Sequence, residues 1–276
     1  MNLSAAADVQ LTDGLAAAVR TVGAQLLEWR RDGGVGGRWV DSQFKAEADT
    51  RAHAALAGQL GMLSPHLTIV SEEDADSITA RRPDAYWLID PIDGTASFAQ
   101  GFDGFVTQVA LIRDRRPTLA AVYAPATDDM FLAAAGGGAT HNGHALRVRA
   151  VPFDAATLID NYPQARGAAA DLMRALNIPR YVESGSLGLK ICRVAQGAAD
   201  VFVKDVVVRD WDVAAADLVL AEAGGTLVDT MGAAFPYEGG FDRRGLVAAT
   251  SADAAGRIVA WFRARRSAQC ASGGEA

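Results

Sequence analysis

The sequence has few cysteines and histidines and no long apolar segment, which argues against a disulfide-rich, zinc-binding or membrane protein. Its two cysteines, Cys192 and Cys270, are too few for a disulfide framework, so we expect a reducing compartment. The N-terminus lacks a basic segment followed by an apolar one, and no apolar run has the length of a membrane span. The four histidines show no metal-ligand spacing, which argues against a zinc site. We therefore expect a cytoplasmic protein with no membrane partner.

The composition favours a chain that folds throughout. Half of the 276 residues are hydrophobic and 21% are charged, which allows one large core or two packed subdomains. The net charge of −7 argues against a general nucleic-acid or membrane-surface binder. There is no internal repeat, and we expect only the tail at residues 267–276 to be disordered.

The most informative stretch covers residues 86–95, which read Tyr-Trp-Leu-Ile-Asp-Pro-Ile-Asp-Gly-Thr. The apolar run predicts a buried strand that ends at Asp90, because Pro91 cannot continue a hydrogen-bonded ladder. Asp93 adds a second carboxylate, and Gly94 with Thr95 can open a helix whose free N–H groups attract an anion. Carboxylates beside an anion would repel it. A divalent cation between them resolves the conflict.

These residues resemble the Asp-Pro-Ile-Asp-Gly-Thr signature of the inositol monophosphatase superfamily. That superfamily comprises magnesium-dependent, lithium-sensitive phosphatases, including the 3'(2'),5'-bisphosphate nucleotidases. Its second signature, Trp-Asp followed by small residues and Ala-Gly-Gly, is matched at residues 211–217 and 223–225. The resemblance extends over roughly residues 40–250 and implies a layered α-β-α-β-α sandwich of the α/β class, shared with fructose-1,6-bisphosphatase.

The resemblance also implies a metal site built from oxygen ligands. Two or three Mg²⁺ ions, or Mn²⁺, would be held by these groups: Glu72, Asp90, the carbonyl of Ile92, Asp93 and Asp212. Glu72 would also take part in catalysis. Asp49 stands where the family has the acidic residue of a Thr-x-x-Asp run, although Ala46 replaces the threonine. Asp49 and Thr95 would orient the attacking water, and the N–H groups of Gly94 and Thr95 would hold phosphate oxygens.

A further group of residues is predicted to line the pocket for the leaving group: Gly185, Ser186, Lys204, Asp205 and Arg209. Two simpler interpretations stay open. Gly185 and Ser186 are also a typical helix cap, and Lys204 and Arg209 could be ordinary surface charges.

The rest of the chain predicts two different halves. Thr12 can cap a first helix that ends near residue 33, a glycine-rich loop occupies residues 33–37, and a second helix runs through Leu60. Apolar runs and turns from residue 105 to 150 predict antiparallel hairpins. From about residue 155 strands and helices alternate. We expect an α+β part at residues 1–152 and an α/β part at residues 153–266.

These features predict a Mg²⁺-dependent phosphomonoesterase acting on a small phosphorylated polyol, sugar or nucleoside. A 3'(2'),5'-bisphosphate nucleotidase is the alternative, favoured by Leu-Lys-Ile-Cys at residues 189–192 and opposed by Ala96 and by Asp-Asn-Tyr-Pro at residues 160–163. A protein of this kind can also serve as a partner in a transcription or RNA complex, for which the short basic cluster of Arg263, Arg265 and Arg266 is the only feature. Nucleic acid is an improbable partner on charge grounds, and the resemblance implies a homodimer.

Overall fold

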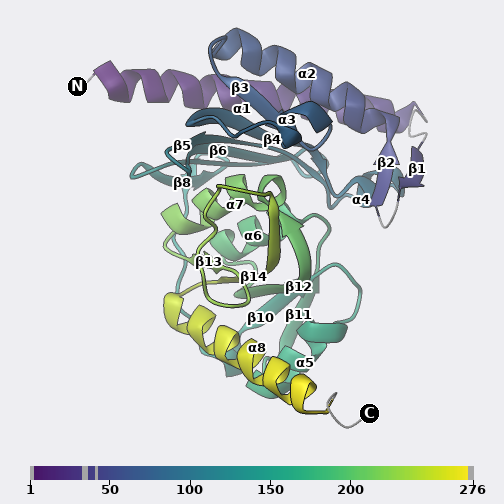
Figure 1. The fold of residues 1–276 in the computed structure, drawn as a ribbon, viewed down its shortest axis with the longest axis vertical. Helices are drawn as coiled ribbons and strands as arrows, with labels where there is room; N and C mark the ends of the chain where they lie inside the picture. The colour runs from purple at the N-terminus through teal and green to yellow at the C-terminus, as the bar shows by residue number, and fades with distance from the viewer. Residues whose placement is uncertain (1–2, 33–36, 41–42, 273–276) are drawn as a thin grey trace.

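The structure, a computed structural model, describes residues 3–32, 37–40 and 43–272, and its elements form five layers (Figure 1). Helices α1 (Leu3–Arg31) and α2 (Glu47–Leu63) form the outermost layer, against one face of a seven-stranded sheet. The sheet has the order β3-β4-β5-β6-β7-β8-β9, and each neighbouring pair is antiparallel except β3 with β4. Its strands are β3 (Thr68–Ser71), β4 (Ala85–Asp93), β5 (Val106–Arg113), β6 (Arg116–Ala124), β7 (Asp129–Ala134), β8 (Gly138–His141) and β9 (His144–Ala145).

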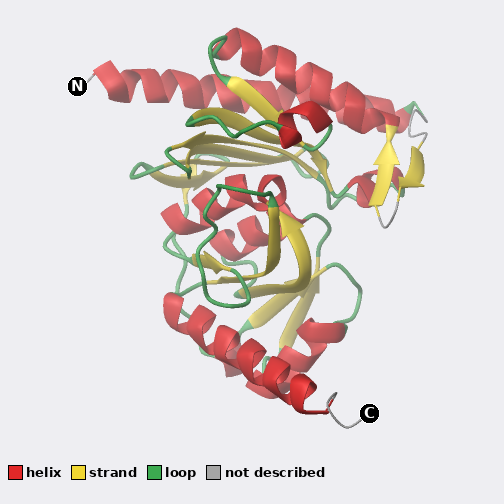
Figure 2. Cartoon of the chain, in the orientation of Figure 1, coloured by secondary structure: helices red, strands yellow, loops and turns green. Residues whose placement is uncertain are grey.

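Helices α6 (Leu187–Gln196) and α7 (Asp210–Glu222) form the middle layer, between the first sheet and a second, five-stranded one (Figure 2). The second sheet has the order β11-β10-β12-β14-β13, and helices α5 (Gly167–Leu176) and α8 (Ala252–Ser272) cover its far face. Its strands are β10 (Thr157–Asp160), β11 (Arg180–Glu183), β12 (Val201–Arg209), β13 (Thr226–Val228) and β14 (Asp242–Ala249). The predicted layered α-β-α-β-α sandwich is confirmed.

Four short elements join these layers. Strands β1 (Gly37–Val40) and β2 (Gln43–Ala46) pair with each other, and helices α3 (Ala75–Thr79) and α4 (Thr95–Ala99) each follow a strand of the first sheet. A single 3₁₀ turn, Phe153–Ala155, leads into the second sheet. None of the helices in the described ranges is both long enough and apolar enough to cross a membrane.

Strand β4 shows why the signature begins with an unbroken apolar run. Trp87 and Ile89 pack in the core beneath α1 and α2, whereas Tyr86 and Leu88 pack in the core that contains α6 and α7. Since successive side chains of a strand point to opposite faces, both faces of β4 must be apolar. Each such side chain contributes about 1.5–3 kcal/mol to folding. Asp90 lies on the same face as Leu88, toward the middle layer.

The proposed division at residue 152 separates the two sheets but not their core. One cluster of buried side chains spans Val70 of β3, Leu220 of α7 and Ala248 of β14. A third cluster, between the five-stranded sheet and helices α5 and α8, contains Leu158, Leu172 and Ile258. The two halves are therefore fixed against each other through α6 and α7.

Several predicted boundaries need correction. Helix α1 begins at Leu3, so Thr12 lies inside it and does not cap it. Residues 145–150 form no strand beyond Ala145. Helix α8 continues to Ser272, so residues 267–272 are helical. Residues 33–36 of the predicted glycine-rich loop, and residues 273–276 of the tail, lie outside the described ranges.

Candidate metal centre

Three carboxylates from distant parts of the chain meet at the boundary of the first sheet and the middle helices. Glu72 follows β3, Asp90 lies on β4 and Asp212 lies in the first turn of α7. One oxygen from each of them lies within 4.8 Å of the others. Asp90 is buried and the other two residues are partly exposed, so the cluster opens toward solvent on one side.

Asp93 points to a different neighbour. Strand β4 does not stop at Pro91 as expected but continues to Asp93 through a shift of register against β5, a β-bulge that accommodates the proline without an N–H donor. Beyond the bulge, Asp93 Oδ1 accepts from Leu187 N (3.1 Å) and Asp93 Oδ2 accepts from Gly188 N (2.6 Å). The first turn of α6 thus holds this carboxylate, in the way that helix N-termini hold anions.

Asp49 and Thr95, the two residues predicted to orient the attacking water, are hydrogen-bonded to each other. The hydroxyl of Thr95 lies 3.0 Å from Asp49 Oδ1 and 3.0 Å from the carbonyl oxygen of Ile92. Asp49 lies in the first turn of α2 and is buried, while Thr95 opens α4 behind Gly94, whose φ of 91° favours glycine. The first turns of helices α2 and α4 therefore bring a carboxylate and a hydroxyl together.

The carboxylates destabilise one another's charged forms. Burial, and then the charge of Glu72, raises the pKa of Asp90 well above its usual value. Burial and the charge of Asp93 likewise raise the pKa of Asp212. The pKa of Asp93 rises to about 6, chiefly through burial, although Gly188 N and Lys190 act to lower it. Crowded carboxylates of this kind need either protons or a cation to neutralise them.

The donor set fits a hard divalent cation. The ligand atoms offered by Glu72, Asp90 and Asp212 are all carboxylate oxygens, which suit Mg²⁺ or Mn²⁺ and suit zinc poorly. The backbone carbonyl of Ile92 could add a further oxygen. The site could hold such a cation at the three carboxylates.

The residues predicted to surround the leaving group divide into two sets. Ser186 is the N-cap of α6, because its Oγ accepts from Leu189 N (3.0 Å), and Gly185 packs directly on Gly104. Lys204 is not a free surface charge, since its Nζ lies 2.5 Å from Asp160 Oδ1. The cap interpretation thus describes the contact of Ser186, and Lys204 is a partly exposed, ion-paired side chain.

Arg209 and Asp205 are more exposed. Asp205 lies in the exposed bulge of β12, between Lys204 and Val207. The Nε of Arg209 lies 3.4 Å from Asp242 Oδ1, a loose ion pair. Arg209 and Glu72 line a pocket of about 660 Å³ together with Ile78, Trp211, Gly240, Phe241, Asp242 and Arg243. This pocket adjoins the carboxylate cluster through Glu72.

Sequence reasoning missed a buried lysine next to this site. Lys190 of α6 is fully buried, and its Nζ contacts Asn161 Oδ1 (2.5 Å) and the carbonyl oxygen of Gly185. Burial, and then the charge of Lys204, lowers its pKa to about 7. The sequence does place this lysine on the apolar side of an amphipathic helix. A fully buried lysine is rare unless it has a hydrogen-bonding or charged partner.

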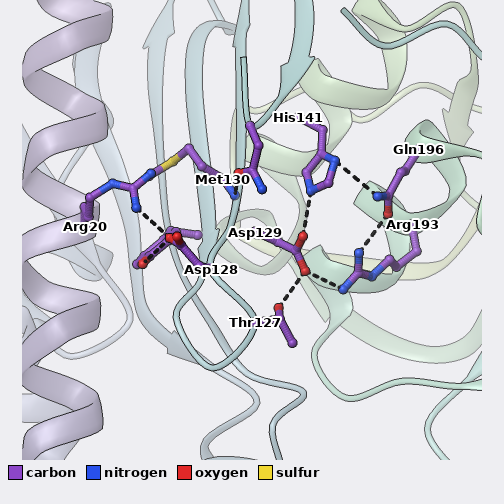
Figure 3. A network of polar contacts seen from close by, with 10 residues as sticks. Arg20, Thr127, Asp128, Asp129, Met130, His141, Arg193 and Gln196 are labelled. Atoms are coloured by element: carbon purple, nitrogen blue, oxygen red, sulfur yellow. Dashed lines mark hydrogen bonds and ion pairs between the residues drawn. The ribbon is translucent and has the colours of Figure 1, made fainter. Parts of the chain in front are cut away.

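The far end of α6 is fastened to the first sheet by a polar network (Figure 3). Arg193 donates to Asp129 Oδ2 (2.7 Å), His141 Nε2 lies 2.6 Å from Asp129 Oδ1, and Gln196 contacts His141 Nδ1. Thr127 donates a further bond to Asp129. His141 also stacks on Phe131 inside this network. Since α6 holds Asp93 at its other end, the network helps to fix the site.

Replacing Asp129 by Asn is expected to cost about 1–3 kcal/mol of unfolding free energy at pH 7, because charged hydrogen-bond partners lose their acceptor. Burial acts to raise the pKa of Asp129, but hydrogen bonds from Thr127, His141 and Arg193 leave it lowered. Its stabilising contribution is therefore present above its usual pKa and lost as pH falls through the lowered one. Urea unfolding of the wild type and the variant should give a difference in unfolding free energy that is smaller at pH 3 than at pH 7. The same difference at both pH values would contradict this prediction.

Known proteins share the fold of this chain and part of its sequence. Residues 7–266 match the sequence profile of the Inositol monophosphatase family. The chain belongs to the inositol monophosphatase family. It is 33% identical over 196 residues to the 3'(2'),5'-bisphosphate nucleotidase CysQ of Aggregatibacter actinomycetemcomitans, covering 68% of this chain and 73% of that protein. It is 32% identical over 203 residues to the Nus factor SuhB of Xylella fastidiosa, covering 70% and 71%.

Solved structures of inositol monophosphatase family proteins support the fold. The IMPase of Thermotoga maritima superposes with a TM-score of 0.77 at 24% identity, covering 91% of this chain and 96% of that one. The extragenic suppressor protein suhB of Bartonella henselae gives a TM-score of 0.77 at 23% identity, covering 91% and 98%. At this identity the likeness establishes the layered architecture only.

Proposed function

We propose that this inositol monophosphatase family member is a Mg²⁺-dependent phosphomonoesterase. The observation that carries the proposal is the convergence of Glu72, Asp90 and Asp212 within 4.8 Å, beside the hydrogen-bonded pair of Asp49 and Thr95. A purely structural site would have no need to crowd carboxylates whose pKa values rise. Family membership and the CysQ relative support the same reaction class.

The chain's own groups divide the work of phosphate ester hydrolysis. Divalent cations bound at the carboxylates would supply a Lewis acid for the phosphoryl group and lower the pKa of a water. Asp49 Oδ1, with the Thr95 hydroxyl between it and the Ile92 carbonyl, is placed to accept a proton from a water that contacts Thr95. Asp93, held by the first turn of α6, would add negative charge beside a cation bound at Asp90 and Asp212. Gly94 and Thr95 would offer N–H groups to phosphate oxygens.

The substrate we propose is a small phosphorylated polyol, sugar or nucleoside. The pocket beside Glu72 has room for such a leaving group, and the loose ion pair of Arg209 with Asp242 leaves its guanidinium free to exchange partners. Asp205, exposed on the bulge of β12, could accept from a leaving-group hydroxyl.

A bisphosphorylated nucleoside is the second candidate substrate. The observation that favours it is a pair of neighbouring lysines, since Lys204 lies close enough to lower the pKa of Lys190. Lys190 contacts Asn161, and Lys204 contacts Asp160. A second phosphate would have to displace Asp160 from Lys204 in order to use this charge. The likeness to CysQ supports this candidate.

A partner role is the candidate of another class, supported by the relatives named Nus factor SuhB. The basic cluster of α8 offers little for it. Arg263 and Arg266 donate to backbone carbonyls of Met231 and Thr230, and Arg265 pairs with Asp171 (2.9 Å). These arginines already tie α8 to neighbouring segments. A homodimer, expected from the family, would be tested by sedimentation.

The proposal is tested by phosphate release with and without Mg²⁺ from inositol 1-phosphate, adenosine 3',5'-bisphosphate, a nucleoside 5'-monophosphate and histidinol phosphate. We expect Mg²⁺-dependent release from at least one of them, and its loss in Asp93→Asn. Selective cleavage of the bisphosphate would favour the nucleotidase. Absence of release from every substrate, with Mg²⁺ bound, would contradict the phosphatase and favour the partner role.

A further inference from the structure

Gln108 is a polar side chain in the middle of an apolar strand. It lies on β5 and is 1% exposed, with Val106 and Ala110 on the same face of the strand, in the core that contains α6 and α7. Placing an amide there is costly unless its groups are hydrogen-bonded. Its position therefore calls for a reason other than packing.

The amide nitrogen of Gln108 bonds to two of the metal motifs at once. Nε2 lies 3.3 Å from Asp93 Oδ2 and 3.1 Å from the backbone carbonyl oxygen of Asp212. Both neighbours are acceptors, which fixes the orientation of the amide, because a flipped group would turn Oε1 toward two oxygens. One side chain thus links the end of β4 to the first turn of α7.

The amide oxygen of Gln108 lies against Gly188 in the first turn of α6. Oε1 is buried and has no hydrogen-bond partner among the described residues, and it faces Gly188. A Cβ atom at position 188 would lie 2.4 Å from Oε1 and 3.1 Å from Asp93 Oδ2. Only glycine lets α6 approach closely enough for Gly188 N to reach Asp93 at 2.6 Å.

We propose that Gln108 is a positioning residue for the metal site, which sets the orientation of the Asp93 carboxylate and the distance between Asp93 and Asp212. The inference rests on the proposed Mg²⁺ site. With Gln108 in place, Asp93 Oδ2 receives two donors, from Gln108 and Gly188, and Oδ1 receives one from Leu187. These three hydrogen bonds restrict rotation of the Asp93 carboxylate. Its remaining lone pairs therefore keep one orientation relative to the metal site.

The chemical type of residue 108 matters as much as its reach. A lysine or arginine here would bring a positive charge into competition with the cation, and a glutamate would add a further negative charge to a cluster whose pKa values are already raised. A neutral amide orients the ligands without changing the charge of the site. This is the usual task of a group that bonds to a metal ligand.

The test is calorimetric Mg²⁺ binding to Gln108→Leu, Gln108→Asn and the control Thr107→Val. Leucine keeps the size and loses the donor, and asparagine keeps the donor on a side chain one methylene shorter. Thr107 is buried next to Gln108, on the opposite face of the strand, and its hydroxyl has no partner among the described residues. We expect the Kd for Mg²⁺ to rise about 10–100-fold in Gln108→Leu, less in Gln108→Asn, and not at all in Thr107→Val.

Two further readouts separate positioning from a general packing role. At saturating Mg²⁺ the KM for the ester should stay close to that of the wild type, while the Mg²⁺ concentration for half-maximal rate rises. Should both Gln108 variants bind Mg²⁺ as tightly as the wild type while melting earlier in EDTA, Gln108 would be a packing residue and the inference wrong. Binding is measured without turnover, so failure of the phosphatase proposal would leave this result interpretable.

Discussion

Replacing Asp90 by Asn is expected to lower Mg²⁺-dependent phosphate release about 10³-fold or more, since a bound cation contributes several kcal/mol to the barrier. Asp90 lies at the centre of the site, 2% exposed, and its pKa responds to Glu72, Asp93, Asp212 and Asp49. Initial rates across a Mg²⁺ titration would measure the loss.

The same change should stabilise the protein when metal is removed. The raised pKa of Asp90 means that the folded state holds its proton more tightly than the unfolded one, so stability falls as pH rises from the usual value near 4 through the raised value. Asp90→Asn removes the titrating carboxyl and therefore this loss of stability. In EDTA at pH 8 the variant should melt higher than the wild type, whereas Asp76→Asn, an exposed control in α3, should change neither rate nor melting. A variant that is both inactive and less stable in EDTA would contradict the account.

Replacing Gly185 by Ala is expected to have the largest effect on stability, more than about 4 kcal/mol of unfolding free energy. A Cβ at position 185 would lie 1.7 Å from the carbonyl oxygen of Gly104, and both groups belong to backbone that cannot step aside. The same close approach of the two backbone segments allows Ser186 N to donate a hydrogen bond to Gly104 O (2.7 Å). This hydrogen bond fixes the start of α6.

Gly58→Ala provides the matched control, because position 58 lies in α2 with open space around a Cβ. There alanine should add about 0.5–1 kcal/mol through helix propensity. Urea unfolding of both variants measures the difference. If the unfolding free energy of Gly185→Ala lay within about 1 kcal/mol of the wild-type value, the prediction would be wrong. The backbone around residue 104 would then have relaxed to accommodate the alanine.

The parts of this fold that follow local rules were predictable from the sequence. The apolar run before Asp90 and the small residues of α7 each match one regular element, so their types and most of their bounds agree with the structure. The resemblance to the inositol monophosphatase superfamily implied a shared ligand set, of which Glu72, Asp90 and Asp212 do meet in the structure. The end of β4 was harder, because a proline that usually stops a strand is absorbed by a bulge.

Contacts between distant segments could not be obtained in this way. The sequence gives no pairing for Asp129, which is 12 residues from His141 and 64 from Arg193. Arg82 and Arg243 enclose the buried Asp210 at 2.6 and 2.8 Å, and that ion-pair group carries no motif either. Gln108 offered one weak signal, a polar residue inside a strand with two apolar faces, whose meaning depends on what packs above it.

The central claim, that the carboxylate cluster is a divalent cation site, is tested most directly by calorimetric titration of the protein with Mg²⁺ at pH 6 in two buffers of different ionisation enthalpy. Burial raises the pKa values of Asp90, Asp93 and Asp212, and neighbouring carboxylates raise those of Asp90 and Asp212 further. Cation binding should therefore release protons into the buffer. The account predicts a buffer-dependent heat that shrinks at pH 8 and binding that is lost in Asp212→Asn. Mg²⁺ binding of equal strength in Asp212→Asn, or none in the wild type at either pH, would contradict it.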